Sequence, residues 1–236
     1  MSVSRRQFLS ASAATVALSA CGVPRRQHAA DVREVTQTID PARHRDGAGV
    51  NLQKTLGSRA LPLLDPFLML DQIHSADPLD WQAGFPDHPH RGFETVSYLL
   101  TGAFEHRDSV GNHGTIANGG TQWMTAGRGI IHSEMPRQIA GQDLWGLQLW
   151  VNLPARLKMQ KPRYQDLAAT TIPELDVDGA RVRLVAGRIG AKRGPVEEIA
   201  VAPTMLEIQL PAGGRFRHRL PATDNTFIQL LDGGLE

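Results

Sequence analysis

The sequence contains a single cysteine, Cys21, among its 236 residues. A chain with one thiol has no internal disulfide and no cluster of thiolate ligands, so a bound metal must use nitrogen and oxygen ligands. Strong net charge is also missing, because 25 Lys and Arg face 24 Asp and Glu and the formal net charge is +1. This balance gives no broad electrostatic attraction to nucleic acid, and we expect no nucleic-acid partner.

A hydrophobic run long enough to span a bilayer is absent as well. The apolar stretch 8–20 has about a dozen residues, whereas a transmembrane helix needs roughly 20. It follows SRRQFL (4–9), which resembles a twin-arginine export signal, and it leads into LSAC (18–21), which resembles a lipobox. These motifs predict a signal peptide over 1–21, a periplasmic or cell-envelope location, and membrane contact only through a lipid on Cys21. An ordinary cleaved signal with an incidental cysteine is the alternative.

The remainder divides by composition. Residues 22–45 are polar and basic and predict a tether. Beyond residue 46, short apolar segments alternate with Gly- and Pro-rich turns, which is typical of an antiparallel barrel. Residues 154–170 resemble a linker with helical turns. The strands that we expect with most definition are 95–100, 147–152, 182–186, 205–209 and 227–231.

Two short stretches carry metal-ligating residues at strand spacing. In His88-Pro89-His90 and in His132-Ser133-Glu134 the candidate ligands are two positions apart, and side chains two apart share one face of a strand. Two such strands side by side would place three imidazoles and one carboxylate on a common inner wall. This ligand set suits one redox-capable first-row metal with positions left for water, substrate or O2. Surface or packing histidines are the alternative for either stretch alone.

Three further residues with ligand-type side chains lie near these stretches in the sequence. Glu94 lies four positions after His90, so it shares the same face if the strand stays extended. It could then be a fifth ligand, a hydrogen-bond acceptor for a ligand, or a partner of Arg91. His106 lies in the charged run 105–108, which predicts a solvated edge, and His74 lies in a stretch that predicts a loop.

Three long stretches of the sequence resemble one known protein family. They are PDHPHRGFETVSYLLTG (86–102), GGTQWMTAGRGIIHSEMP (119–136) and GLQLWVNL (146–153), and together they resemble the pirin family of bicupins. The resemblance implies an all-β bicupin. An antiparallel, jelly-roll-like cupin barrel would occupy 46–160, and 161–236 would form a second cupin barrel, which we expect to be incomplete.

The resemblance also implies a ligand set and a metal. The pirin pattern assigns the metal to His88, His90, His132 and Glu134, whereas the wider cupin pattern would use Glu94. Fe(II) is favoured because mixed histidine and carboxylate ligation with open positions suits it. Mn, Co, Ni and Cu remain compatible with the same residues.

Two functions follow from the family likeness. The first is a metal-dependent dioxygenase of the quercetin 2,3-dioxygenase type, which acts on a flavonol-like aromatic and O2. Glu134, or Glu94 where it is not a ligand, would then be the general base. The second is a non-catalytic envelope protein that senses redox state or a ligand and binds a protein partner. A degenerate gene fragment is a third interpretation, and we expect a monomer.

Overall fold

The computed structural model describes residues 32–235. The predicted signal peptide over 1–21 and the lipidated Cys21 lie outside these residues. A compact unit begins at Ile39, and the boundary predicted between residues 160 and 161 stays a prediction. Within the described part of the chain, no helix has the length and apolar character needed to cross a membrane.

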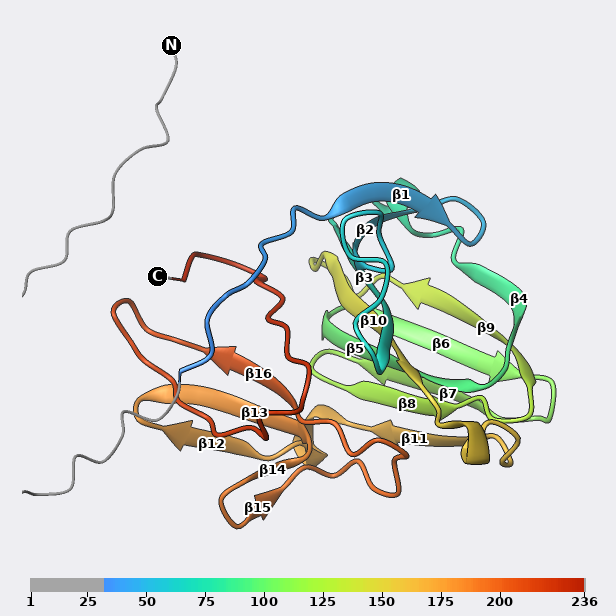
Figure 1. The fold of residues 1–236 in the computed structure, drawn as a ribbon. Coiled ribbons are helices and arrows are strands. Elements are labelled where there is room, and N and C mark those ends of the chain that lie inside the picture. Colours follow the sequence, from blue (N-terminus) through green and yellow to red (C-terminus); the bar gives the residue numbers. More distant parts are fainter. Residues whose placement is uncertain (1–31, 236) are drawn as a thin grey trace, which may run out of the picture. The chain divides into compact units, whose positions relative to one another are not determined.

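Two antiparallel sheets build the first part of the unit (Figure 1). The larger has the order β1-β2-β3-β10-β5-β8-β11, and the smaller has the order β4-β9-β6-β7. The strands of the larger sheet are β1 Ala42–Asp46, β2 Val50–Leu56, β3 Phe67–Ser75, β5 Phe93–Thr101, β8 Thr121–Thr125, β10 Leu144–Asn152 and β11 Arg163–Leu167. Those of the smaller sheet are β4 Phe85–His90, β6 Ala103–Asp108, β7 His113–Ala117 and β9 Ile130–Arg137.

The predicted fold class is confirmed, since the described residues are all-β and every strand pairing is antiparallel. The two sheets share one apolar core. Leu99 and Leu144 from the larger sheet are buried with Phe104 and Ile116 from the smaller one. Because alternate residues of a strand face opposite sides, these side chains mark the inner faces of the two sheets.

The opposite face of the larger sheet packs on the last part of the chain. Val96 and Tyr98 of β5 are buried in one cluster with Val185 and Val196. The later strands form a three-stranded sheet, β12-β13-β16, and a two-stranded ribbon, β14-β15. Their bounds are β12 Glu174–Val177, β13 Ala180–Ala186, β14 Arg188–Ile189, β15 Lys192–Arg193 and β16 Met205–Gln209. Three 3-10 helices connect the strands, at Pro78–Asp80, Ala155–Leu157 and Ala169–Thr171.

Some predicted elements differ from the structure. The segment expected to be a linker contains β11, which pairs with β8 at the edge of the larger sheet. Strand β1 lies within the end of the predicted tether, and His74 lies in β3 rather than in a loop. The strand predicted over 227–231 is wrong, because this segment pairs with no strand. Its contacts are made by side chains instead, such as the ring of Phe227 against that of Phe67 at 5.1 Å.

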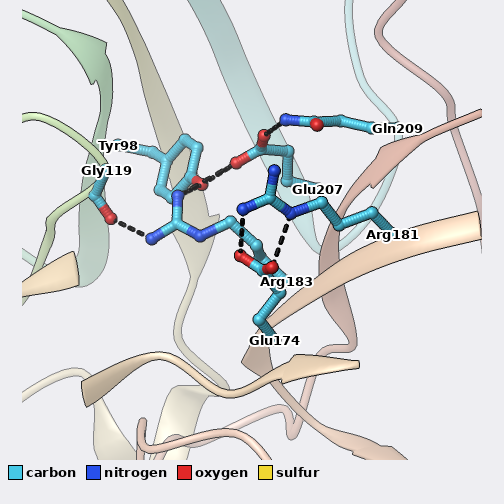
Figure 2. Close-up of polar contacts among 7 residues, drawn as sticks. All are labelled: Tyr98, Gly119, Glu174, Arg181, Arg183, Glu207 and Gln209. Atoms are coloured by element: carbon cyan, nitrogen blue, oxygen red, sulfur yellow. Dashed lines mark hydrogen bonds and ion pairs between the residues drawn. The ribbon is translucent and has the colours of Figure 1, made fainter. Parts of the chain in front are cut away.

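The partly buried side chain of Arg183 links the larger sheet to the three-stranded sheet (Figure 2). Arg183 of β13 donates to the carboxylate of Glu207 at 3.0 Å, to the hydroxyl of Tyr98, and to the carbonyl oxygen of Gly119. The Tyr98 hydroxyl also donates to Glu207. Burial, together with the Glu207 carboxylate, raises the pKa of Tyr98, so the phenol stays protonated and keeps this bond.

We expect Arg183→Met to lower the free energy of unfolding by about 3 kcal/mol, because it leaves a shielded carboxylate without its cation. Urea unfolding measures the change. Arg181→Met is the matched control, since Arg181 shares a face of β13 with Arg183 but is more exposed, and it pairs there with the exposed Glu174 of β12. Solvent screens that pair, and its loss should change stability little. Equal losses in the two variants would contradict a special role for Arg183.

Candidate metal centre

Strands β4 and β9 carry the two predicted ligand stretches and lie side by side. Their antiparallel register sets His88 directly opposite His132 and His90 opposite Ile130. Ala126 to Gly129 form the turn before β9, where Gly127 has a φ of 52°. A β-carbon at this position would meet the carbonyl oxygen of Gln160 at 2.1 Å, so only glycine fits. The pairing of β4 with β9 confirms that the two stretches lie side by side, as predicted.

Three ring nitrogens converge on one point. His88, His90 and His132 each offer a nitrogen, and these atoms all lie within 4.8 Å of one another. The Nδ1 of His88 lies 2.8 Å from the carbonyl oxygen of Pro86. A carbonyl can only accept, so Nδ1 carries the proton and the lone pair of a neutral His88 is on Nε2. This Nε2 faces the Nε2 of His90 at 3.0 Å.

Burial keeps two of these imidazoles neutral. Burial, together with the neighbouring imidazoles of His132 and His88, lowers the pKa of His90 to about 3. Burial also lowers the pKa of His132 to about 3, with His88 and His106 adding to the effect. Neutral imidazoles present lone pairs, and this is the form that binds metal.

The residues present fit a metal ion. Both ring nitrogens of His132 are buried without a hydrogen-bond partner among the described residues, although buried polar atoms are nearly always paired. Two nitrogens bound to one ion at about 2.1 Å and at right angles would lie roughly 3.0 Å apart. The separation of the His88 and His90 nitrogens matches this value.

Glu134 lies beside the three histidines. Its Oε2 is 3.9 Å from the Nε2 of His132. The carboxylate is 4% exposed and accepts two hydrogen bonds, from the Ser97 hydroxyl at 2.9 Å and from the Gln148 amide at 2.8 Å. Its two donors therefore fix the carboxylate next to the convergent nitrogens.

Ser97 and Gln148 were not identified from the sequence. They come from β5 and β10 of the larger sheet, where they are register partners, while Glu134 comes from the smaller sheet. The contact depends on how the two sheets face each other, and no sequence spacing encodes that arrangement. The one available signal is the period-2 pattern of β5, which assigns Ser97 and the inward-facing Leu99 to the same face.

Glu94 is not among the three histidines. Gly92 has a φ of 82° and ends the extended run after His90, so the condition for a shared face, a strand that stays extended, is not met. Glu94 lies on the face of β5 opposite to that of Ser97, together with Val96. It is fully buried there and accepts a hydrogen bond from the Thr125 hydroxyl at 2.7 Å. Burial raises the pKa of Glu94.

His106 differs from its expected position. It is 5% exposed rather than solvated, and it lies opposite Glu134 in the pairing of β6 with β9. Its Nε2 is 3.2 Å from a carboxylate oxygen of Asp166. Side chains alternate along β6, so that Phe104 and His106 face inward while Glu105 and Arg107 face outward. The charged residues on both sides of His106 hid this alternation in the sequence.

An aromatic wall adjoins the centre. The His90 ring meets Phe93 and Trp150 at centroid distances of 5.1 and 5.2 Å. The Trp150 Nε1 is buried and has no hydrogen-bond partner within the part of the chain that the structure describes. The surroundings of the three imidazoles thus combine apolar surface with one free donor.

Comparison with known proteins gives consistent matches. The family model described as Pirin matches residues 42–151. A Pseudomonas aeruginosa protein that carries the provisional name quercetin 2,3-dioxygenase is 46% identical over 195 residues, which are 80% of this chain and 68% of that protein. A pirin-like protein from Caulobacter vibrioides is 44% identical over 204 residues, which are 86% of this chain and 74% of that protein.

A solved structure matches as well. The quercetin 2,3-dioxygenase from Acinetobacter baumannii superimposes with a TM-score of 0.57 at 37% identity. The match covers 66% of this chain and 57% of the solved one. The chain therefore spans just over half the length of that protein.

We expect Gln148→Leu to weaken metal binding about 10- to 100-fold, because loss of a group that orients a ligand typically costs this much. Ser97→Ala should act in the same direction. Competition with a chelator on folded protein measures the affinity. Thr125→Val is the control, since it removes a hydroxyl bond to Glu94 on the other face of β5. An affinity unchanged in Gln148→Leu and Ser97→Ala would show that Glu134 is not part of the metal centre.

Proposed function

Because the chain belongs to the pirin family of the cupin superfamily, we propose that it is a metal-dependent dioxygenase of the quercetin 2,3-dioxygenase type. In this proposal His88, His90, His132 and Glu134 hold one divalent transition metal ion. The observation that carries it is the convergence of three imidazole nitrogens within 4.8 Å, two of them on buried rings with lowered pKa values. The names of the Pseudomonas and Acinetobacter relatives support the choice of reaction.

Fe(II) is the proposed ion, because three imidazoles and one carboxylate with open positions suit it. When bound, such an ion supplies Lewis-acid and O2 chemistry. A dioxygenase adds both atoms of O2 to its substrate, so the reaction needs no external reductant. The substrate class is a flavonol-like aromatic.

The chain's own residues have separate tasks. Glu134 accepts the proton of the substrate hydroxyl as general base, and its bonds from Ser97 and Gln148 hold the carboxylate in place. Phe93 and Trp150 offer aromatic surface next to His90, which suits a planar substrate. The unpaired Trp150 Nε1 is a donor for a substrate oxygen.

A second candidate is a sensor whose metal state controls binding of a partner. The low exposure of His132 and His90, at 1% and 7%, favours it, because a substrate reaches a shielded ion with difficulty. Catalytic turnover separates the two functions. An enzyme consumes O2 many times per metal ion, whereas a sensor changes shape or affinity without consuming it.

We expect the wild-type chain to contain about one more divalent transition metal ion than the variant His88→Ala/Glu134→Ala, because the variant loses two of the four donors of this centre. Plasma mass spectrometry on folded protein measures this. The wild type should also consume O2 with quercetin, and the variant should not. A folded wild type that stays metal-free after reconstitution with Fe(II) would refute the metal centre.

Two controls sharpen this experiment. His113→Ala removes an exposed histidine outside the centre and should leave metal content and turnover unchanged. Glu134→Gln should abolish turnover, and Glu94→Gln should retain it, because Glu94 lies on the other face of β5. The reverse result would assign the base to Glu94. Metal binding with no O2 consumption would favour the sensor.

We further propose that the chain is exported by the twin-arginine route and anchored by a lipid on Cys21. The basis is the pair of motifs at 4–9 and 18–21. Cys21→Ala should move the protein from the membrane fraction to the soluble periplasmic fraction, because it removes the acylated thiol. Arg5→Lys/Arg6→Lys should leave the precursor unexported. Cell fractionation with immunoblotting measures both, and a wild type found only in the cytoplasm would refute the proposal.

A further inference from the structure

A second group of ligand-type side chains shares no residue with the three histidines. It consists of His44 and Asp46 on β1 and Asp71 on β3. One ligand atom from each residue lies within 4.8 Å of the other two. None of the three belongs to the centre formed by β4 and β9.

The strand register explains how these residues meet. His44 and Asp46 are two apart on β1 and share one face. β1 pairs with β2, where His44 is opposite Leu52, and β2 pairs with β3, where Lys54 is opposite Asp71. Because Leu52 and Lys54 are also two apart, all of these side chains lie on the same face of the sheet.

Several atoms in this group have no partner. Asp71 is 2% exposed, and its Oδ1 has no hydrogen-bond partner among residues 32–235. Both ring nitrogens of His44 are likewise buried without a hydrogen-bond partner there, and the Nε2 has only an ion-pair contact of 3.5 Å with the Asp71 Oδ2. A buried carboxylate oxygen and an imidazole without partners are costly unless something else binds them.

Lys54 only partly satisfies the group. Its ammonium donates to the Asp71 Oδ2 at 2.8 Å and leaves the Oδ1 unbonded. The two carboxylates and this ammonium sum to one negative charge when His44 is neutral. Asp46 is exposed, so a cation can reach the group from solvent. The ammonium therefore competes with a divalent ion for one oxygen only.

We propose that His44, Asp46 and Asp71 form a second cation site, which takes a divalent ion of the zinc class. One imidazole and two carboxylates suit Zn²⁺ and the neighbouring first-row ions better than they suit Ca²⁺ or Mg²⁺, which prefer oxygen ligands alone. A bound ion would link the edge strand β1 to β3 across β2. This site shares no ligand with the proposed dioxygenase centre, although Asp71 lies opposite Gln148 in the pairing of β10 with β3.

The test is calorimetric titration of the full chain with Zn²⁺. The wild type should bind two equivalents. His88→Ala/His132→Ala should retain one, at the second site, and His44→Gln should retain one, at the first. In the background of His88→Ala/His132→Ala, Lys54→Met should raise the remaining affinity at least tenfold, because the competing ammonium is gone. His113→Gln, a matched histidine change outside both groups, should still bind two.

The outcomes separate the two sites. If the first centre fails, the wild type binds one equivalent, which His44→Gln removes, and the second site stands. If His88→Ala/His132→Ala is folded by circular dichroism, binds no Zn²⁺, and gains none with Lys54→Met, the second site is refuted. One equivalent that survives in both His44→Gln and Asp71→Asn on that background would also refute it.

Discussion

The pairing of β4 with β9 is the constraint on which the site depends. Antiparallel register sets His88 opposite His132, and the spacing of two within β4 adds His90 on the same face. A slip of one residue would turn every one of these side chains to the other face. Gly127 allows the tight turn that leads into β9, because no larger residue fits against the backbone at Gln160. The geometry of the proposed metal centre is thus set first by backbone pairing and second by side-chain chemistry.

The grouping of the candidate ligand residues was predictable because these residues obey a local rule. A period of two within a strand is visible in the sequence, and it correctly joined His88 with His90 and His132 with Glu134. What lay beyond that rule was less accessible. Ser97 and Gln148 reach Glu134 from another sheet, so their role depends on sheet order and on which faces meet. Glu94 was misplaced because the left-handed backbone at Gly92 resets the alternation.

The same distinction applies to the fold. The first part, with its regular turns and alternating strands, matched expectation in class and in most elements. Strand β11 was missed because its pairing with β8 supplies the stabilisation that its mixed sequence does not indicate. The strand prediction for 227–231 was wrong for the opposite reason. Its sequence has strand character, but it pairs with no strand among residues 32–235, and it makes side-chain contacts such as that of Phe227 with Phe67 instead.

Strand β5 presents Ser97 to the carboxylate of Glu134 and, one residue later, Tyr98 to Arg183 and Glu207. Ser97 and Tyr98 are joined by one planar peptide unit, so a shift of the β5 backbone at this point would move both side chains. The three-stranded sheet that carries Arg183 and Glu207 therefore acts as a brace behind the wall of the metal centre. A change in the later sheet that moves the β5 backbone at Tyr98 would therefore also act on the bond from Ser97 to Glu134, although no residue of the later sheet contacts Glu134 by a hydrogen bond or ion pair among those described.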